Sequence, residues 1–164
     1  MNLDNLKSEI DKIKLKTEEL KSLVNKFKKI IIIGNGGSNA IASHISVDYT
    51  KWLNIPTFSF SDGPMLTAYV NDFGIEEAYR QFLLNFASQD TFIILISSSG
   101  NSINIINAAK YCEDNNLKYA GLSGFNFNNY LNSMNADFKY HVNYNSYGVV
   151  ELAHETLLHS IVKN

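Results

Sequence analysis

The chain has 164 residues, a formal net charge of -2 at pH 7 and a pI near 6.1. This balance argues against broad electrostatic attraction to nucleic acid or an anionic membrane, so we expect a small ligand. One cysteine, Cys112, excludes a disulfide framework and a thiolate metal cluster. The first residues lack the basic and apolar pattern of a secretory leader, no Pro/Gly/Ser linker divides the chain, and no apolar stretch approaches the roughly 18 residues that span a bilayer, so we expect neither a leader nor a membrane span. We therefore expect one cytoplasmic domain over residues 1–164.

The hydrophobic pattern switches between a helix-like and a strand-like period along the chain. Residues 1–29 contain an amphipathic helix, expected over 3–27, after which strands and helices alternate. The predicted strands cover 30–33, 56–60, 91–96, 118–122 and 137–142. The predicted helices cover 38–52, segments within 64–87, 101–115 and 147–162. This alternation predicts an α/β fold with a parallel sheet covered by helices on both faces.

Two serine-rich turns each follow an apolar strand and precede a helix. The first turn (34–38) reads Gly-Asn-Gly-Gly-Ser, and the second turn (97–102) reads Ser-Ser-Ser-Gly-Asn-Ser. Backbone N–H groups and hydroxyls at the positive N-terminus of a helix bind phosphate. Because ligands collect at the carboxyl ends of parallel strands, the two turns are predicted to hold one phosphate between them. Ser99 and Ser102 could instead cap the following helix.

The glycines of the first turn also suggest a dinucleotide site. However, Asn39 stands where the fingerprint G-x-G-x-x-G has its third glycine, and the acidic residue expected about 20 residues on is missing from the end of the second predicted strand. Asp62 comes too late for that role. The pattern therefore disfavours NAD.

Taken together, the motifs resemble the sugar isomerase (SIS) domain family. The two turns, with Asn71-Asp72-Phe73-Gly74 between them and His154 and His159 near the end, are similar to its phosphoheptose isomerase branch. The resemblance implies a SIS-type doubly wound parallel sheet of about five strands, flanked by helices, and a homotetramer packed through the N-terminal helix with active sites between subunits. It implies conversion of sedoheptulose 7-phosphate to D-glycero-D-manno-heptose 7-phosphate, which supplies heptose for a bacterial surface polysaccharide.

The resemblance also implies roles for individual residues. Asp48 and His159 would exchange the protons. His44, Asp48, Glu151 and His159 would hold a divalent metal, zinc, and His44 and Asp48 are expected to approach the other two across a subunit interface. Asp72 would contact the sugar, although it could instead be a turn or cap residue. The complete set implied for substrate and phosphate binding is Asn35, Gly36, Ser38, Asp72, Ser97, Ser98, Ser99, Asn101 and Ser102.

The spacing of the titratable residues agrees with that chemistry. His44 and Asp48 share one face of a predicted helix, and Glu151, Glu155 and His159 are spaced four apart on the last helix. An aldose–ketose isomerase needs a base to take a proton from the carbon beside a carbonyl and an acid to protonate the neighbouring oxygen, through an enediol. A carboxylate and an imidazole suit this task.

Two substitutions keep a second hypothesis open. Asp48 stands where the isomerases usually have glutamate, and Glu151 stands where they usually have glutamine. The shorter Asp48 favours a non-catalytic SIS protein that binds a phosphosugar or another protein, whereas the retained histidines favour the enzyme.

The remaining polar and aromatic side chains show weaker signals of function. His154 is open between function and a hydrogen bond across an interface. Glu155 is interpreted as a charge on a solvated face or interface, and His141 and Cys112 as packing or surface residues. Trp52, with Lys51, is a candidate to reach a neighbouring subunit's ligand.

Overall fold

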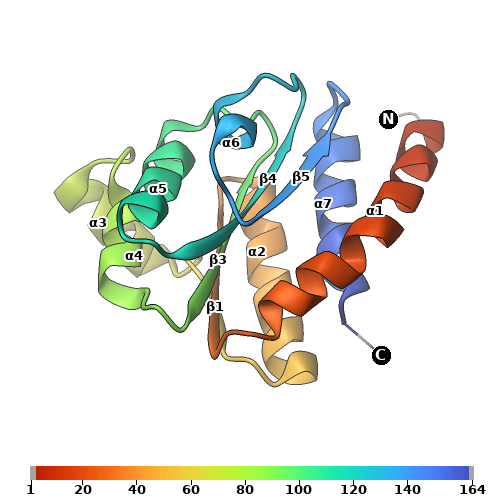
Figure 1. Cartoon of the computed structure of the whole chain (residues 1–164). Helices are drawn as coiled ribbons and strands as arrows, with labels where there is room; N and C mark the ends of the chain where they lie inside the picture. Colours follow the sequence, from red (N-terminus) through yellow and green to blue (C-terminus); the bar gives the residue numbers. More distant parts are fainter. Residues whose placement is uncertain (1–2, 163–164) are drawn as a thin grey trace.

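A computed structural model describes residues 3–162 of the chain. Within this range five parallel strands form one sheet in the order β2-β1-β3-β4-β5 (Figure 1). The strands are β1 (Lys29–Gly34), β2 (Thr57–Ser59), β3 (Thr91–Ser97), β4 (Lys118–Gly124) and β5 (Phe138–Val142). All five predicted strands are confirmed, with ends that differ by at most two residues.

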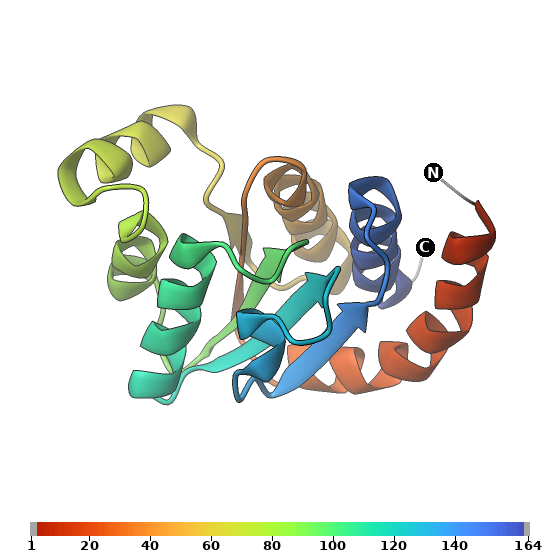
Figure 2. The same cartoon turned by 90° about the horizontal axis from the view of Figure 1, so that it is seen from above.

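Helices cover both faces of the sheet, as the alternating pattern predicts (Figure 2). One face carries α1 (Leu3–Val24), α2 (Gly37–Asp48) and α7 (Tyr147–Ser160). The other carries α3 (Gly63–Phe73), α4 (Ala78–Phe86) and α5 (Ile103–Asp114), and a short α6 (Tyr130–Ser133) follows β4. Within residues 3–162, none of the helices combines the length and apolar character that a membrane crossing requires.

The helix expected over 38–52 is shorter than predicted. α2 ends at Asp48 and the chain continues as a π-helical turn, η1 (Tyr49–Leu53), which Asn54 ends with a left-handed φ of 56°. Tyr49 is buried, and its hydroxyl donates a hydrogen bond to Leu158 O at 2.9 Å. The first residue of η1 therefore contacts α7 at the point where the α-helical geometry ends.

Two hydrophobic cores lie on the two faces of the sheet. In β1, Ile30 and Ile32 point toward α2 and α7, whereas Ile31 and Ile33 point toward α4 and α5. Both sets are fully buried because alternate residues of a strand face opposite sides and both sides carry helices. α1 adds Leu20 to the first core, so its apolar stripe packs within its own chain.

The order of the strands creates a switch point between β1 and β3. From β1 the chain passes outward to β2 at one edge, and from β3 it passes to β4 and β5 at the other. Gly34 pairs with Ile96, so the two strands end side by side, and each leads directly into a serine-rich turn. Open α/β sheets bind ligands at such a point.

His154 lies fully buried beneath the sheet, where its Nε2 is 3.0 Å from Ser123 O. This bond lies within one chain, so a hydrogen bond across an interface is not the role the structure gives it. Burial lowers the pKa of His154 from 6.5 to about 4, and its Nδ1 has no hydrogen-bond partner among residues 3–162.

This burial predicts a loss of stability in mild acid. The unfolded chain protonates His154 near pH 6.5 but the folded chain only near pH 4, so the full stability is present above pH 6.5 and falls as the pH drops toward 4. The loss approaches about 3 kcal/mol. Denaturant unfolding at pH 7.5 and pH 5 should show a smaller pH-dependent loss for His154→Gln than for the native chain. Equal losses would contradict a buried neutral imidazole.

Candidate functional site

Glycines and amide side chains shape the first turn. Asn35 and Asn104 form a reciprocal pair, in which each amide nitrogen donates to the other's oxygen at 2.9 Å. The Tyr79 hydroxyl lies 2.8 Å from both Gly34 O and Asn35 Oδ1. A Cβ on Gly34 would come within 2.7 Å of the Ser38 backbone. Only glycine therefore lets the chain fold back so closely at the start of α2.

The second turn is organised by its own hydroxyls. Ser97 Oγ accepts a hydrogen bond from Gly100 N at 3.1 Å and donates one to Ser102 Oγ at 3.1 Å. Ser99 Oγ accepts one from Asn101 N at 3.2 Å. Ser102 is the N-cap residue of α5, yet its side chain makes no capping bond to the helix. The capping role considered for Ser102 is therefore wrong, and its hydroxyl faces Ser97 instead.

Between the two turns lies a cavity of about 220 Å³, which we call the cradle. The cradle sits where α2 and α5 begin, so backbone N–H groups and hydroxyls gather at two helix N-termini, as phosphate binding requires. Ser98 Oγ is buried and has no hydrogen-bond partner among residues 3–162. The cradle is lined by Asn35, Gly36, Gly37, Ser38, Ile96, Ser97, Ser98, Ser99, Ser102, Tyr147 and Glu151.

Ser98 offers a direct test of the cradle because its hydroxyl makes no hydrogen bond within residues 3–162 that the substitution would remove. Ser98→Ala should weaken binding of a sugar phosphate by about 1.5–3 kcal/mol, roughly 10- to 100-fold, by calorimetry. The free protein should keep or slightly raise its free energy of unfolding, since an unpaired buried hydroxyl is removed. Ser133→Ala is the control and should leave binding unchanged, because Ser133 is exposed on α6 and does not line the cradle. Full affinity in Ser98→Ala would remove Ser98 from the site.

The structure places two predicted contacts away from the cradle wall. Asp72 is exposed on α3, where its carboxylate accepts a hydrogen bond from the Asn71 amide at 2.9 Å. Asn71, and not Asp72, lines an adjoining cavity with Asn35 and Gly36. Asn101 Oδ1 accepts a hydrogen bond from Tyr130 N at 3.1 Å, which ties the second turn to α6. Sugar contacts from Asp72 and Asn101 stay predictions.

Sequence reasoning missed the supporting residues of the cradle. Tyr147 begins α7 and lines the cavity, and Asn104 and Tyr79 hold Asn35 from the opposite side. None of the three belongs to a recognisable spacing, so the sequence contains no local signal for them. Their roles follow from the packing of α4, α5 and α7 around the switch point.

A second polar group lies between α2 and α7, and we call it the imidazole cluster: His44, Asp48 and His159. Asp48 Oδ2 is 3.3 Å from His159 Nδ1 and 3.8 Å from His44 Nε2. The two rings meet edge to face with centroids 4.9 Å apart. His44 is 57% exposed and Asp48 21%, so solvent reaches the cluster from the His44 side. The cluster is therefore accessible to a small ligand.

The cluster has the donors and spacing of a divalent metal site. One ligand atom from each residue lies within 4.8 Å of the others. A tetrahedral zinc ion bound at about 2.0–2.1 Å separates its ligands by about 3.3 Å, the distance already found between Asp48 and His159. Two imidazoles and one carboxylate form a nitrogen–oxygen set that zinc accepts. Three of the four predicted ligands thus fit a divalent ion.

One expectation about these residues is wrong. His44 and Asp48 meet His159 within a single chain and not across a subunit interface, because α2 and α7 pack side by side on the same face of the sheet. The sequence could not show this, since the two helices are separated by most of the chain.

On α7, the carboxylates of Glu151 and Glu155 face groups other than those that the resemblance implies. A Cβ on Gly37 would come within 2.5 Å of Glu151 Oε1, so this carboxylate faces the first turn. Glu155 Oε1 instead lies 3.2 Å from His44 Nδ1, beside the imidazole cluster. The sequence pattern indicates a solvated-face or interface charge for Glu155, whereas the structure places it against His44; its spacing of four from His159 is the signal that points to the cluster.

A groove between α2 and α7 lies beside both the cradle and the imidazole cluster. Its cavity of about 410 Å³ is bordered by His44 and Glu155 at the cluster end. At the other end it shares Gly37 and Glu151 with the cradle. His44 is the member of the imidazole cluster that lines this groove.

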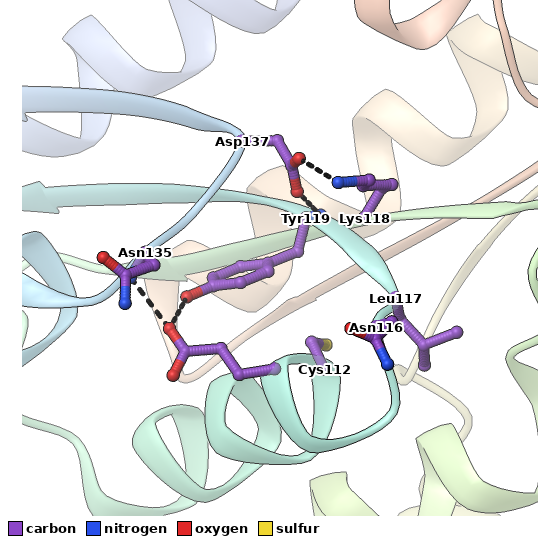
Figure 3. Close-up of a pocket in the computed structure, with 8 residues that line it drawn as sticks. Cys112, Asn116, Leu117, Lys118, Tyr119, Asn135 and Asp137 are labelled. Atoms are coloured by element: carbon purple, nitrogen blue, oxygen red, sulfur yellow. Dashed lines mark hydrogen bonds and ion pairs between the residues drawn. The ribbon is translucent and has the colours of Figure 1, made fainter.

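A separate cavity of about 310 Å³ lies where β4 begins, away from both turns (Figure 3). Glu113 Oε1 accepts hydrogen bonds from the Tyr119 hydroxyl at 2.9 Å and from Asn135 N at 2.8 Å, and Asp137 pairs with Lys118 at 2.7 Å. Cys112 in its wall is buried, and burial raises the pKa of its thiol to about 12, as expected for a packing residue. These carboxylates already have partners within the chain.

Comparison with known proteins shows the family and the fold of this chain. A model of the SIS domain family matches residues 2–124. A phosphoheptose isomerase of Buchnera aphidicola is 35% identical over 104 residues, covering 60% of this chain and 54% of its own length. The chain thus spans about half the length of the curated relatives it matches.

Two solved structures share the fold. Phosphoheptose isomerase GmhA from Neisseria gonorrhoeae superposes with a TM-score of 0.89 at 23% identity, covering 97% of this chain and 89% of that chain. A phosphoheptose isomerase from Francisella tularensis gives a TM-score of 0.73, also at 23% identity, covering 98% and 96%. The family match ends at residue 124, before α7, whereas the structural likeness extends over it.

Proposed function

This chain belongs to the SIS domain family, and from that premise we propose that it is an aldose–ketose isomerase which converts sedoheptulose 7-phosphate to D-glycero-D-manno-heptose 7-phosphate. The proposal is supported by the names of its curated relatives and by its own cradle and imidazole cluster. The product would supply heptose for a bacterial surface polysaccharide.

The observation that carries the proposal is that a phosphate cradle and an acid–base cluster lie beside the same groove between α2 and α7, which shares Gly37 and Glu151 with the cradle and is lined by His44. His44 comes seven residues after Gly37 on α2, which is about 10 Å along the helix axis. Helical side chains tilt toward the N-terminus, so Asp48 reaches back toward the cradle. A phosphate held at the two turns would therefore lay the sugar chain along the groove, with its reacting end at the cluster.

The residues then divide the reaction between them. Asp48 removes the proton from C1 of the ketose while His159 donates a proton to the O2 carbonyl oxygen, which leaves an enediol. The proton on Asp48 is returned to C2 and the O1 proton passes to His159, which forms the aldehyde and restores both groups. The hydroxyls of the cradle hold the phosphate throughout, and this fixes the reacting carbons near both groups.

A divalent ion, which we propose to be zinc, fits between His44, Asp48 and His159. When bound, it would act as a Lewis acid that polarises the carbonyl oxygen. Asp48 has two carboxylate oxygens, so one can face the ion while the other accepts the proton. Glu151, which faces Gly37 nearer the cradle, stays a predicted fourth ligand.

We also propose that the chain acts as a cytoplasmic homotetramer. Leu15 on α1, Val47 on α2 and Trp52 in η1 are 82%, 52% and 55% exposed, and symmetric association would cover such apolar side chains. Light scattering measures the assembly directly, and a stable monomer would contradict this part of the proposal.

A panel of ketose phosphates tests the reaction. Incubation in D₂O with the zinc-loaded protein should convert sedoheptulose 7-phosphate to the aldose. Because the proton held on the Asp48 carboxyl group can exchange with solvent before it is returned, deuterium should appear at C2, as read by NMR. Calorimetry with the same ketose phosphates distinguishes the isomerase from the second hypothesis, a non-catalytic SIS protein. Tight binding without conversion of any sugar would identify a phosphosugar-binding SIS protein, for which the shorter Asp48 is the supporting feature.

A further inference from the structure

The two imidazoles of the cluster lie between two carboxylates. Asp48 Oδ2 faces His159 Nδ1 at 3.3 Å and His44 Nε2 at 3.8 Å. Glu155 Oε1 faces the other nitrogen of each ring: His44 Nδ1 at 3.2 Å, within hydrogen-bond distance, and His159 Nε2 at 3.8 Å. Each ring therefore points one nitrogen toward Asp48 and its other nitrogen toward Glu155.

A neutral imidazole has one N–H and one lone pair, and only the lone pair can bind a metal. A carboxylate such as Glu155 can only accept a hydrogen bond, so His44 must place its N–H on Nδ1 to make this contact. Its lone pair then lies on Nε2, on the side of Asp48 and His159. Metal-binding histidines commonly donate their second nitrogen to a carboxylate in this way.

We propose that Glu155 is a positioning residue, which holds His44 in the Nδ1–H tautomer and so directs its Nε2 lone pair to a divalent ion shared with Asp48 and His159. This inference rests on the metal site of the proposed function, and it assigns to Glu155 a part that the sequence pattern did not.

The surroundings of Glu155 distinguish this role from that of a surface charge. Its side chain is only 31% exposed, and within residues 3–162 its ion pairs are those with the two imidazoles. Asp48 and Glu155 together place two negative charges around two rings, a balance that favours a bound cation. Glu155 also borders the groove, so it fixes His44 at the end where the sugar would react.

The test compares Glu155→Gln with Glu151→Gln, which removes the same charge one turn earlier on α7. The tautomer of His44 is read in the metal-free proteins by NMR of ¹⁵N-labelled rings, and zinc affinity is measured by competition with a chelating dye. Glu155→Gln should shift His44 away from the Nδ1–H form and weaken zinc binding about 10- to 100-fold. Glu151→Gln should leave the tautomer of His44 unchanged.

Two results would overturn the proposal: a His44 ring that stays in the Nδ1–H form in Glu155→Gln, or zinc affinity that is equal in that variant and the native chain. Neither measurement uses a sugar, so failure here is distinct from failure of the isomerase assay. Circular dichroism confirms that both variants are folded before the comparison is made.

Discussion

Asp48→Asn is expected to lower turnover of sedoheptulose 7-phosphate by at least about 100-fold, because a positioned general base contributes about 10²–10⁴ in rate. The amide has nearly the shape of the carboxylate but cannot accept the proton from C1. Binding of the sugar phosphate should be largely retained, since the cradle hydroxyls belong to the two turns and not to the imidazole cluster.

Steady-state kinetics and NMR measure the two halves of this expectation. In D₂O, Asp48→Asn should also lose deuterium incorporation at C2 in parallel with turnover. Asp11→Asn serves as the matched control, because Asp11 is 85% exposed on α1 and its ion pair among residues 3–162 is the one with Lys14 at 3.2 Å. Turnover near the native value in Asp48→Asn would move the base to another residue.

Gly100→Ala should destabilise the fold and impair the cradle together. Gly100 has a φ of 66°, which costs alanine about 1–2 kcal/mol. A Cβ there would overlap the Asn129 side chain, which is buried and hydrogen-bonded to Asn132 N, Gly124 O and Asn126 O. Displacing Asn129 loses these bonds, so the free energy of unfolding should fall by about 3–5 kcal/mol.

Two other glycines separate the cost of backbone strain from the cost of displacing Asn129. Gly74 has a φ of 78° with open space around its Cβ position, so Gly74→Ala should cost only the backbone strain. Gly63 has neither a positive φ nor a close neighbour, and Gly63→Ala should be neutral or slightly stabilising. Denaturant unfolding of the three variants should rank them Gly100, Gly74, Gly63. An effect of Gly100→Ala no larger than that of Gly74→Ala would mean that Asn129 yields without cost.

Sequence alone determined the sheet and the position of the cradle. A strand with helices on both faces must be apolar at every position, and the isoleucine runs of β1 and β3 meet this requirement over 30–33 and 92–96. The turns that follow need glycine and small hydroxyl side chains so that the chain can fold back closely. This requirement is local, so a short stretch of sequence reveals it. Parallel strands then bring the two turns to the same edge.

Tertiary structure decided how the reactive side chains are combined. Helical spacing correctly put His44 and Asp48 on one face, yet it could not show that α7 packs against that face within the same chain. The hydrogen bond from His44 to Glu155 joins residues 111 apart in sequence, and the choice of Glu155 over Glu151 depends on how α7 is rotated against α2. Periodicity defines which residues share a helix face. Only the packing of one helix on another determines what that face meets.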